Sequence, residues 1–208
     1  MSTFITIHPK NPQARLVQEV VANIRAGALC VYPTDSCYAF GCSIGNKAAM
    51  ERINRIRQTD KDHNFTLVCK DLSEIAIYAK VANTAFRMMK SLTPGPYTFI
   101  LKATHEVPRR LQNPKRKTIG LRVPAHPIVQ AILTELGEPI ISSTVILPEQ
   151  EMPETDPETI RELLEKHVDL IIDGDNCGLQ PTTVVDLISD PPKIIRQGKG
   201  LIDWLTNE

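Results

Sequence analysis

Residues 12–35 read PQARLVQEVVANIRAGALCVYPTD, an amphipathic segment that is followed by a short apolar run with a polar ending. One apolar face recurs at helical spacing, which predicts a helix over residues 12–25, with Asn11 as its cap and Gly27 as its end. Its apolar positions are Leu16, Val17, Val20, Val21 and Ile24. The run ALCVYP at 28–33 contains β-branched and aromatic residues and predicts a buried strand. A helix that leads directly into a buried strand indicates an α/β fold.

The same alternation continues along the chain. Further helices are predicted from Asn46 and over residues 71–79, 84–92, 126–136 and 156–166, and further strands over residues 66–69, 97–103, 118–123, 139–145, 168–173, 182–187 and 192–196. The early alternation predicts a mixed sheet with parallel pairs covered by helices, and the closely spaced late strands suggest antiparallel additions. Because no repeat or linker interrupts the chain, we expect one domain over residues 1–208, with its core in about 10–200 and a short C-terminal tail.

Composition narrows the class of protein. The chain has 208 residues and 42% hydrophobic content, which suffices for a real core. Its five cysteines are odd in number and show no CxxC spacing, so we expect reduced thiols in the cytoplasm and no structural metal. The start MSTFITIHPK has no signal-peptide pattern, and no apolar run is long enough to span a bilayer, so we expect neither secretion nor membrane insertion.

The formal net charge is zero, but the charges are unevenly placed. One acid-free basic stretch holds Arg109, Arg110, Lys115, Arg116 and Lys117, and a second holds Arg52, Arg55, Arg57 and Lys61. Residues 149–169 are predominantly acidic. If folding joins the two basic stretches, a neutral protein acquires a positive face that attracts phosphates. The alternative interpretation is ordinary solvated surface.

Polar residues occur at the ends of several predicted strands, where α/β sheets commonly bind ligands. They are Thr34, Asp35, Thr118, Arg122, Ser142, Ser143, Thr144, Thr182, Thr183 and Arg196. Buried hydroxyls that converge with two arginines would suit a carboxylate or a phosphate. The alternative is that each hydroxyl bonds to nearby backbone while the arginines face solvent. The chain contains no P-loop, no GxGxxG and no metal-binding motif, so a metal would enter with a phosphate ligand.

Six short motifs occur in a fixed order along the chain. They are VYPTDSCYAFG at 31–41, RIR at 55–57, TIGLRVP at 118–124, SST at 142–144, PTTVVDL at 181–187 and IIRQG at 194–198. The ordered set resembles the YrdC/YciO family over about residues 10–200. The segments RIRQ, HNFTL and VPRRLQ resemble the YciO branch of the family in particular.

The resemblance implies a twisted open α/β domain with a basic concave face that binds double-stranded RNA. In the catalytic branch the same cavity joins threonine, bicarbonate and ATP into threonylcarbamoyl-AMP, the donor for a modified adenosine in tRNA. Carried over by motif, the threonine-facing residues are Thr34, Arg122, Ser142 and Thr182. The nucleotide-facing residues are Arg55, Arg57, Asn64, Thr118, Thr144 and Arg196. ATP or AMP, with Mg²⁺ brought in by the phosphates, is the implied cofactor, and the first basic stretch is the implied RNA surface.

Two motifs depart from the catalytic branch. Arg55-Ile56-Arg57 stands where that branch has Lys-x-Arg, and Thr144-Val145-Ile146 stands where it has Ser-x-Asn. Arginine presents a planar fork instead of a compact ammonium. Isoleucine removes a hydrogen bond worth about 1.5–3 kcal/mol to a charged group, which would slow synthesis by roughly one to two orders of magnitude. An apparent two-residue insertion near 61–64 would also displace Asn64.

Three hypotheses remain open at this point. The first is a nucleotide- and RNA-binding relative of the synthase, which grips tRNA or double-stranded RNA. The second is an altered threonylcarbamoyl enzyme that either synthesises weakly or removes the group. The third is a protein that binds another carboxylate or a protein partner and no nucleic acid.

Overall fold

The computed structural model describes residues 2–59 and 64–202, and within these ranges all the strands join one sheet. The strands are β1 Thr3–Thr6, β2 Cys30–Tyr32, β3 Ala39–Ser43, β4 Thr66–Val68, β5 Ala79–Lys80, β6 Tyr97–Ala103, β7 Thr118–Arg122, β8 Ile140–Thr144, β9 Leu170–Asp173, β10 Thr183–Asp186 and β11 Lys193–Arg196. The helices are α1 Ala14–Arg25, α2 Lys47–Arg57, α3 Leu72–Tyr78, α4 Asn83–Leu92, α5 Pro127–Leu136 and α6 Pro157–Leu164, and a short 3₁₀ turn covers Arg109–Leu111. None of these helices is long and apolar enough to cross a membrane.

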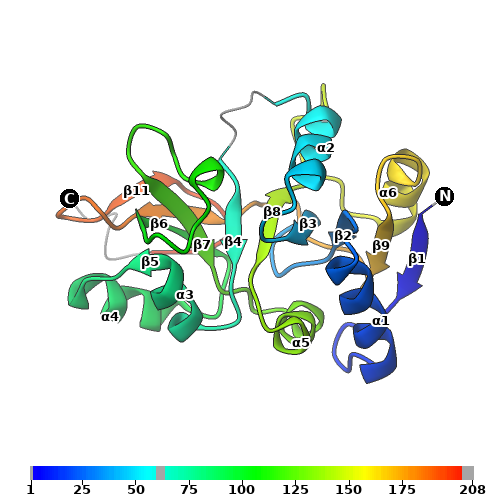
Figure 1. Ribbon diagram of the computed structural model, residues 1–208, viewed down its shortest axis with the longest axis horizontal. Coiled ribbons are helices and arrows are strands. Elements are labelled where there is room, and N and C mark those ends of the chain that lie inside the picture. The colour runs from blue at the N-terminus through cyan, green and yellow to red at the C-terminus, as the bar shows by residue number, and fades with distance from the viewer. Residues whose placement is uncertain (1, 60–63, 203–208) are drawn as a thin grey trace.

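The sheet is open and mixed, with the strand order β1-β9-β2-β3-β8-β4-β7-β6-β10-β11, and β5 pairs with β6 beside this path. Parallel pairs join β1 with β9, β2 with β9, β4 with β7, and β6 with β10, while the other neighbours are antiparallel. The predicted mixed sheet with helices is therefore confirmed. Figure 1 shows the strands running across the molecule from β1 at one edge to β11 at the other.

The prediction of late antiparallel additions is correct only for β11. The strand β9 lies parallel between β1 and β2, and β10 lies parallel to β6. The reason is that β9 and β10 are close in sequence but belong to distant parts of the sheet. Each is paired with strands much earlier in the chain, so the short spacing between them says nothing about their direction.

Three strands that the sequence did not reveal are β1, β3 and the two-residue β5, and the N-terminus of α1 also differs from the prediction. β3 has the sequence AFGCS and is buried almost throughout, so it has no polar alternation to mark it. The residue before α1 is Gln13, and no side chain caps it. Asn11 belongs to the preceding turn, where its backbone N–H donates to His8 Nδ1.

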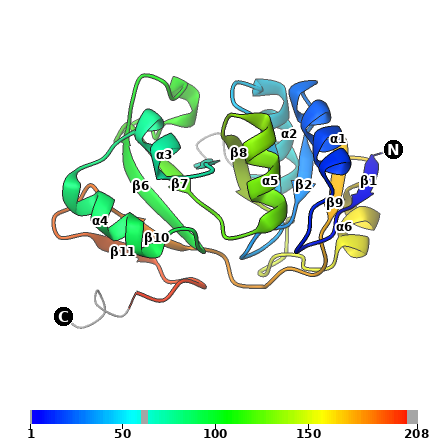
Figure 2. The ribbon, with the colours of Figure 1, turned by 90° about the horizontal axis from the view of Figure 1, so that it is seen from below.

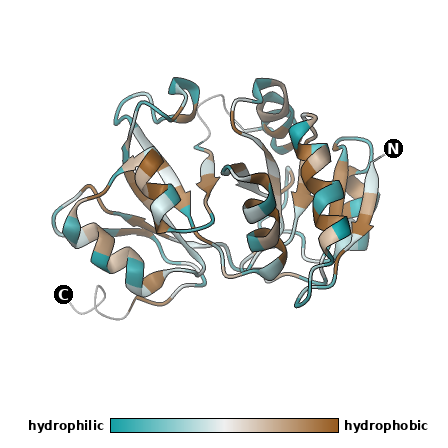
Figure 3. Ribbon diagram, turned by 60° about the horizontal axis from the view of Figure 1, so that its bottom comes forward, coloured by the Kyte–Doolittle hydropathy of each residue, from teal (hydrophilic) through white to brown (hydrophobic). Residues whose placement is uncertain are grey.

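Helices cover both faces of the sheet in the half that contains β1, β9, β2 and β3 (Figure 2). The buried residues of α1 and α5 form one cluster with side chains from these strands. Apolar residues of α2 and α6 belong to a second cluster, which also includes apolar residues of α3 and α4 beside β5, β6 and β7. Figure 3 shows both hydrophobic and hydrophilic residues on the front helices, as expected for elements with one buried face.

Gly41 in β3 allows an aromatic side chain to cross the sheet surface. A Cβ at Gly41 would lie 2.7 Å from Cε1 of Tyr32. The Tyr32 ring is fully buried, and its hydroxyl donates to Ser142 Oγ at 2.7 Å. Gly41 and Ser142 are paired residues of β3 and β8. The glycine thus lets Tyr32 orient one of the predicted ligand-facing hydroxyls.

We expect Gly41→Ala to lower the free energy of unfolding by about 1–3 kcal/mol, because the new methyl group overlaps the Tyr32 ring. Urea denaturation followed by circular dichroism measures this loss. In a Tyr32→Leu background the loss should be smaller, since the overlapping ring is gone. Equal losses in the two backgrounds would contradict this account of Gly41.

Candidate functional site

A cavity of about 400 Å³ opens on one face of the sheet, where β8, β4, β7, β6 and β10 lie side by side. Its polar wall comes from alternate strand positions, namely Thr66, Thr98, Thr118, Arg122, Ser142 and Thr144. The residues between them include Leu67, Phe99, Leu121 and Ile141, which lie in the core. The two-residue period of a strand explains this division, because successive side chains point to opposite faces.

Strand register brings the polar positions together. Gly120 of β7 is paired with Thr66 of β4 and with Ile100 of β6, and Thr66 is also paired with Ser142 of β8. Val184 of β10 is paired with Thr98. Residues that are far apart in sequence therefore form one continuous surface of hydroxyl groups.

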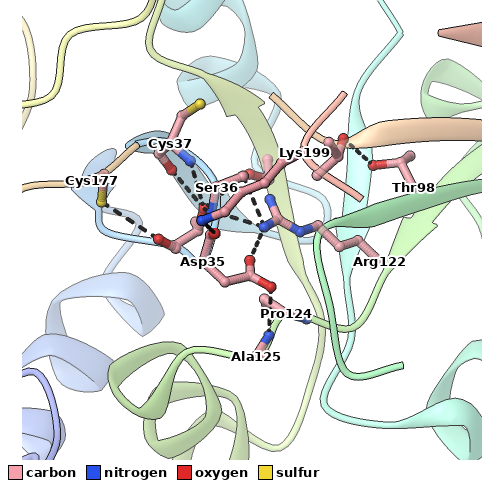
Figure 4. Close-up of polar contacts among 12 residues, drawn as sticks. Asp35, Ser36, Cys37, Thr98, Arg122, Pro124, Ala125, Cys177 and Lys199 are labelled. Carbon is pink, nitrogen blue, oxygen red and sulfur yellow. Dashed lines mark hydrogen bonds and ion pairs between the residues drawn. The ribbon is translucent and has the colours of Figure 1, made fainter. Parts of the chain in front are cut away.

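One end of the cavity is built around Arg122 (Figure 4). Its Nη2 donates to Thr34 Oγ1 at 3.3 Å and to Ser36 Oγ at 3.0 Å, and it forms an ion pair with Asp35. The second carboxylate oxygen of Asp35 accepts from the backbone N–H of Ala125 at 2.8 Å. Within the described ranges Arg122 Nε is buried without a hydrogen-bond partner. This end therefore holds a fixed guanidinium with an unused donor.

Thr34 shapes the loop between β2 and β3. Its hydroxyl accepts from the backbone N–H groups of Ser36 and Cys37 and donates to the carbonyl oxygen of Cys37. This local turn consumes most of the hydrogen-bonding capacity of a buried hydroxyl. The loop presents Ser36 and Cys37 to the cavity, while Thr34 lies behind them next to Arg122.

The other end of the cavity is built around Arg196 and Thr182. Arg196 donates to the carbonyl oxygen of Thr182 from Nε at 3.2 Å and from Nη2 at 2.9 Å. The Thr182 hydroxyl in turn lies 2.8 Å from the hydroxyl of Thr98. Burial lowers the pKa of the Arg196 guanidinium from its ordinary value, because burial disfavours the charged form. The pair thus places a partly desolvated cation beside two hydroxyls.

Arg57 of α2 reaches the cavity from the side of β8. Its side chain donates to Ser143 Oγ and, more weakly, to the carbonyl oxygen of Ile146 at 3.4 Å. Burial lowers the pKa of the Arg57 guanidinium as well. The apolar side chain of Ile146 itself lines the cavity next to Thr144.

The structure brings together eight of the ten residues that the family motifs assign to threonine or nucleotide. They are Arg57, Asn64, Thr118, Arg122, Ser142, Thr144, Thr182 and Arg196. Thr34 does not line the cavity but contacts Arg122 from behind. Arg55 is exposed on α2 and does not line the cavity formed by the described residues. Local sequence placed Arg55 and Arg57 in one motif, but the turn of the helix directs them to different sides.

The basic stretch at 109–117 lies beside the cavity. Arg116 lines it and forms an ion pair with the buried carboxylate of Asp186 at 2.6 Å. Arg110 donates to the carbonyl oxygen of Gly45 at 2.6 Å, and Arg109, Lys115 and Lys117 are exposed. In the second basic stretch Arg52 pairs with Asp169, and Lys61 lies outside the described residues. The two stretches therefore do not contribute equally to a positive face.

Sequence reasoning missed several residues of this site. Ser36, Cys37, Thr98 and Asn113 line the cavity, and Lys199 contacts the loop that carries the first two. Thr98 could have been found, because it is a lone hydroxyl at alternate spacing in the strand YTFILKA. Lys199 carried no such signal, since it lies in the irregular segment after β11.

The donor set suits an anion and does not suit a resident metal ion. The charged side chains that line the cavity are Arg57, Arg116, Arg122 and Arg196. Within the described part of the chain, no group of three or more His, Cys, Asp or Glu side chains could hold a metal. Guanidinium groups and hydroxyls are typical partners of phosphate and carboxylate oxygens.

Comparison with known proteins agrees with the fold. The model of the Sua5, YciO and YrdC family, described as "Telomere recombination", matches residues 22–198. The uncharacterized protein YciO of Escherichia coli is 58% identical over 200 residues, which are 96% of this chain and 97% of that protein. Its crystal structure has a TM-score of 0.95 and covers 99% of this chain and 100% of its own.

Two relatives with stated ligands or activities are more distant. The threonylcarbamoyl-AMP synthase of Vibrio vulnificus is 28% identical over 162 residues, which are 76% of this chain and 86% of the synthase. The crystal structure of P. abyssi Sua5 complexed with L-threonine has a TM-score of 0.86 at 24% identity and covers 95% of this chain and 58% of Sua5, and at this identity it supports the fold alone. Because the family model spans residues 22–198 and YciO is similar along nearly its whole length, the chain belongs to the Sua5/YciO/YrdC family and is a relative of threonylcarbamoyl-AMP synthase.

Proposed function

We propose that this protein binds a nucleotide and an amino acid such as L-threonine side by side in the cavity, and that it binds RNA on the adjoining basic segment. The observation that carries the proposal is the convergence of eight motif residues on one cavity. The nucleotide-facing and the threonine-facing residues are in direct contact there, since Arg196 Nη2 lies 3.4 Å from Thr182 Oγ1. P. abyssi Sua5, which shares the fold, is complexed with L-threonine, and we propose an amino acid of the same kind for this chain.

The nucleotide would occupy the part of the cavity that contains Arg57, Thr118, Thr144 and Arg196. Arg196 is an exposed residue, and among the described residues its guanidinium donates to the neutral oxygens of Thr182, so a phosphate would compensate its charge. Thr118 and Thr144 could donate hydroxyl hydrogen bonds to phosphate or ribose oxygens. Mg²⁺ would arrive with the phosphates of ATP.

RNA would bind where the segment between β6 and β7 exposes its cations. Arg109, Lys115 and Lys117 are exposed on this segment, next to the cavity that Arg116 lines. Cations at such positions attract the phosphate backbone without reading its sequence. The proposal therefore predicts binding of tRNA or double-stranded RNA that weakens as salt rises.

A second candidate function is catalysis of a threonylcarbamoyl transfer, either slow synthesis of threonylcarbamoyl-AMP or removal of the group. It is favoured by the presence of Arg122, Ser142 and Thr182 in the same cavity as the nucleotide-side residues. It is opposed by Ile146, whose apolar side chain lines the cavity where the synthase motif has asparagine. The cavity offers positioning and charge, which are the main contributions to transfer at a phosphate.

We expect Arg196→Gln to weaken ATP binding by about tenfold or more, because it removes a charged partner of the phosphate. Arg55→Gln is the matched control, since Arg55 is exposed outside the cavity, and its affinity should equal that of the natural protein. Isothermal titration calorimetry with ATP and with AMP measures both. If wild-type protein binds neither nucleotide nor L-threonine but responds to another carboxylic acid, the site belongs to a different ligand class.

We expect the triple variant Arg109→Gln, Lys115→Gln, Lys117→Gln to weaken binding of double-stranded RNA, and to reduce the slope of log affinity against log salt by roughly one per lost phosphate contact. The control is a variant with the same charge loss at the exposed residues Lys80, Arg87 and Lys90. Fluorescence anisotropy at several salt concentrations gives both slopes. Identical slopes for the two triple variants would exclude the segment at 109–117 as the RNA surface.

We expect Ile146→Asn to raise pyrophosphate release from ATP, in the presence of threonine and bicarbonate, by roughly one to two orders of magnitude over wild type. The added amide restores a hydrogen-bonding group at the cavity wall. The synthase of Vibrio vulnificus serves as the positive control, and release of threonine from modified tRNA is followed in parallel. No turnover in either direction, for wild type and variant alike, would leave binding as the function of the cavity.

A further inference from the structure

The charge of Arg122 is already balanced within the protein. Arg122 and Asp35 form an ion pair whose side chains are only 9% and 10% exposed. The Nε of Arg122 is buried and has no hydrogen-bond partner within the described ranges. However, the pair as a whole carries no net charge. A carboxylate that enters this end of the cavity would lose its hydration and meet a neutral pair, unless another cation lies nearby.

Lys199 provides such a cation. Its Nζ donates to the backbone carbonyl oxygen of Asp35 at 2.5 Å, and Figure 4 shows its side chain extending over the Asp35–Cys37 loop and ending at the Asp35 backbone. An ammonium has three donors, so two remain after this bond. In the described part of the chain Lys199 takes part in no ion pair. Its charge is therefore available to a ligand.

The backbone around Lys199 is held in place. The N–H of Lys199 donates to the carbonyl oxygen of Pro181 at 2.9 Å, and the N–H of Gly198 donates to Thr183 Oγ1 at 2.9 Å. Thr183 Oγ1 donates in turn to the carbonyl oxygen of Gly200 at 2.6 Å. A Cβ at Gly198 would lie 2.3 Å from the Pro181 oxygen, so this close approach requires glycine. The position of the lysine is thus set by backbone hydrogen bonds.

The charge of Lys199 is one of the influences on the pKa of the Cys37 thiol. Cys37 lines the cavity, and burial raises the pKa of its thiol. Arg122, Lys199 and Arg196 oppose this rise in the pKa, in that order of strength. Lys199 is not itself among the residues that line the cavity, and its ammonium lies at the carbonyl oxygen of Asp35 in the adjoining loop.

We propose that Lys199, from outside the cavity wall, favours by its charge ligands with a carboxylate at the Arg122 end of the cavity. The inference rests on the proposed function, in which an amino acid lies beside the nucleotide. Arg122 would contribute its guanidinium to the cavity wall, and Lys199 would contribute the net positive charge. Together they would discriminate an amino acid from an analogue in which the carboxylate is replaced by an uncharged group.

Calorimetric titration with L-threonine and L-threoninol tests the selection. Lys199→Met should weaken L-threonine binding about three- to fivefold at low salt, as expected for a partly exposed charge pair, and leave L-threoninol binding unchanged. Lys90→Met is the matched control, because Lys90 is exposed on α4, and it should behave as wild type. Equal weakening of both ligands, or of neither, would overturn the role of Lys199. Absence of L-threonine binding by wild-type protein would instead refute the proposed function.

A second measurement does not depend on threonine. Alkylation of Cys37 by iodoacetate and by iodoacetamide is compared by peptide mass spectrometry, since the two reagents differ in a carboxylate. In both reactions the Cys37 thiolate displaces iodide, so any change in its pKa affects the two rates alike. Lys199→Met should lower the ratio of the iodoacetate rate to the iodoacetamide rate about threefold, and Lys90→Met should not. A ratio that is unchanged by Lys199→Met would contradict the inference.

Discussion

The ion pair between Arg122 and Asp35 lies where β7, the loop after β2 and the residues before α5 meet. Asp35 accepts from Arg122 with one carboxylate oxygen and from the backbone N–H of Ala125 with the other. Both side chains are almost fully removed from water, and loss of one partner of such a pair typically costs about 3–5 kcal/mol. The hydroxyls of Thr34 and Ser36 complete the partners of Arg122 Nη2. One wall of the cavity therefore depends on this pair.

The other cavity cations differ in how far the protein compensates their charge. Arg116 is paired with the carboxylate of Asp186, whereas Arg196 has the neutral oxygens of Thr182 as its partners. Burial of Arg196 disfavours its charged form, and an anion would reverse that cost. The cavity thus favours a strongly charged ligand at Arg196. At the neutralised Arg122 pair, hydrogen-bond geometry matters more, and Lys199 supplies the net charge.

The two departures from the synthase motifs, Arg55 and Ile146, differ in their position relative to the cavity. Arg55 is exposed on α2, on a different side of the helix from Arg57, so the exchange of lysine for arginine there lies outside the cavity wall. Ile146 lines the cavity beside Thr144, and its side chain can neither donate nor accept a hydrogen bond. Sequence motifs alone gave both positions the same importance. Of these two positions, Ile146 is the one that lines the cavity formed by the described residues.

Periodicity and capping residues by themselves determined most helices and strands, and the polar residues at the ends of predicted strands marked the cavity wall. These signals depend on neighbours along the chain, which the sequence displays directly. The pairing of β9 and β10 with strands from the start and middle of the chain, and the presence of β1 and β3 in the sheet, required the tertiary structure. The same holds for the separation of Arg55 from Arg57 and for the position of Lys199 over the Asp35 loop. The physical reason is that strand partners and the ends of long side chains are fixed by contacts between distant segments, which no local pattern records.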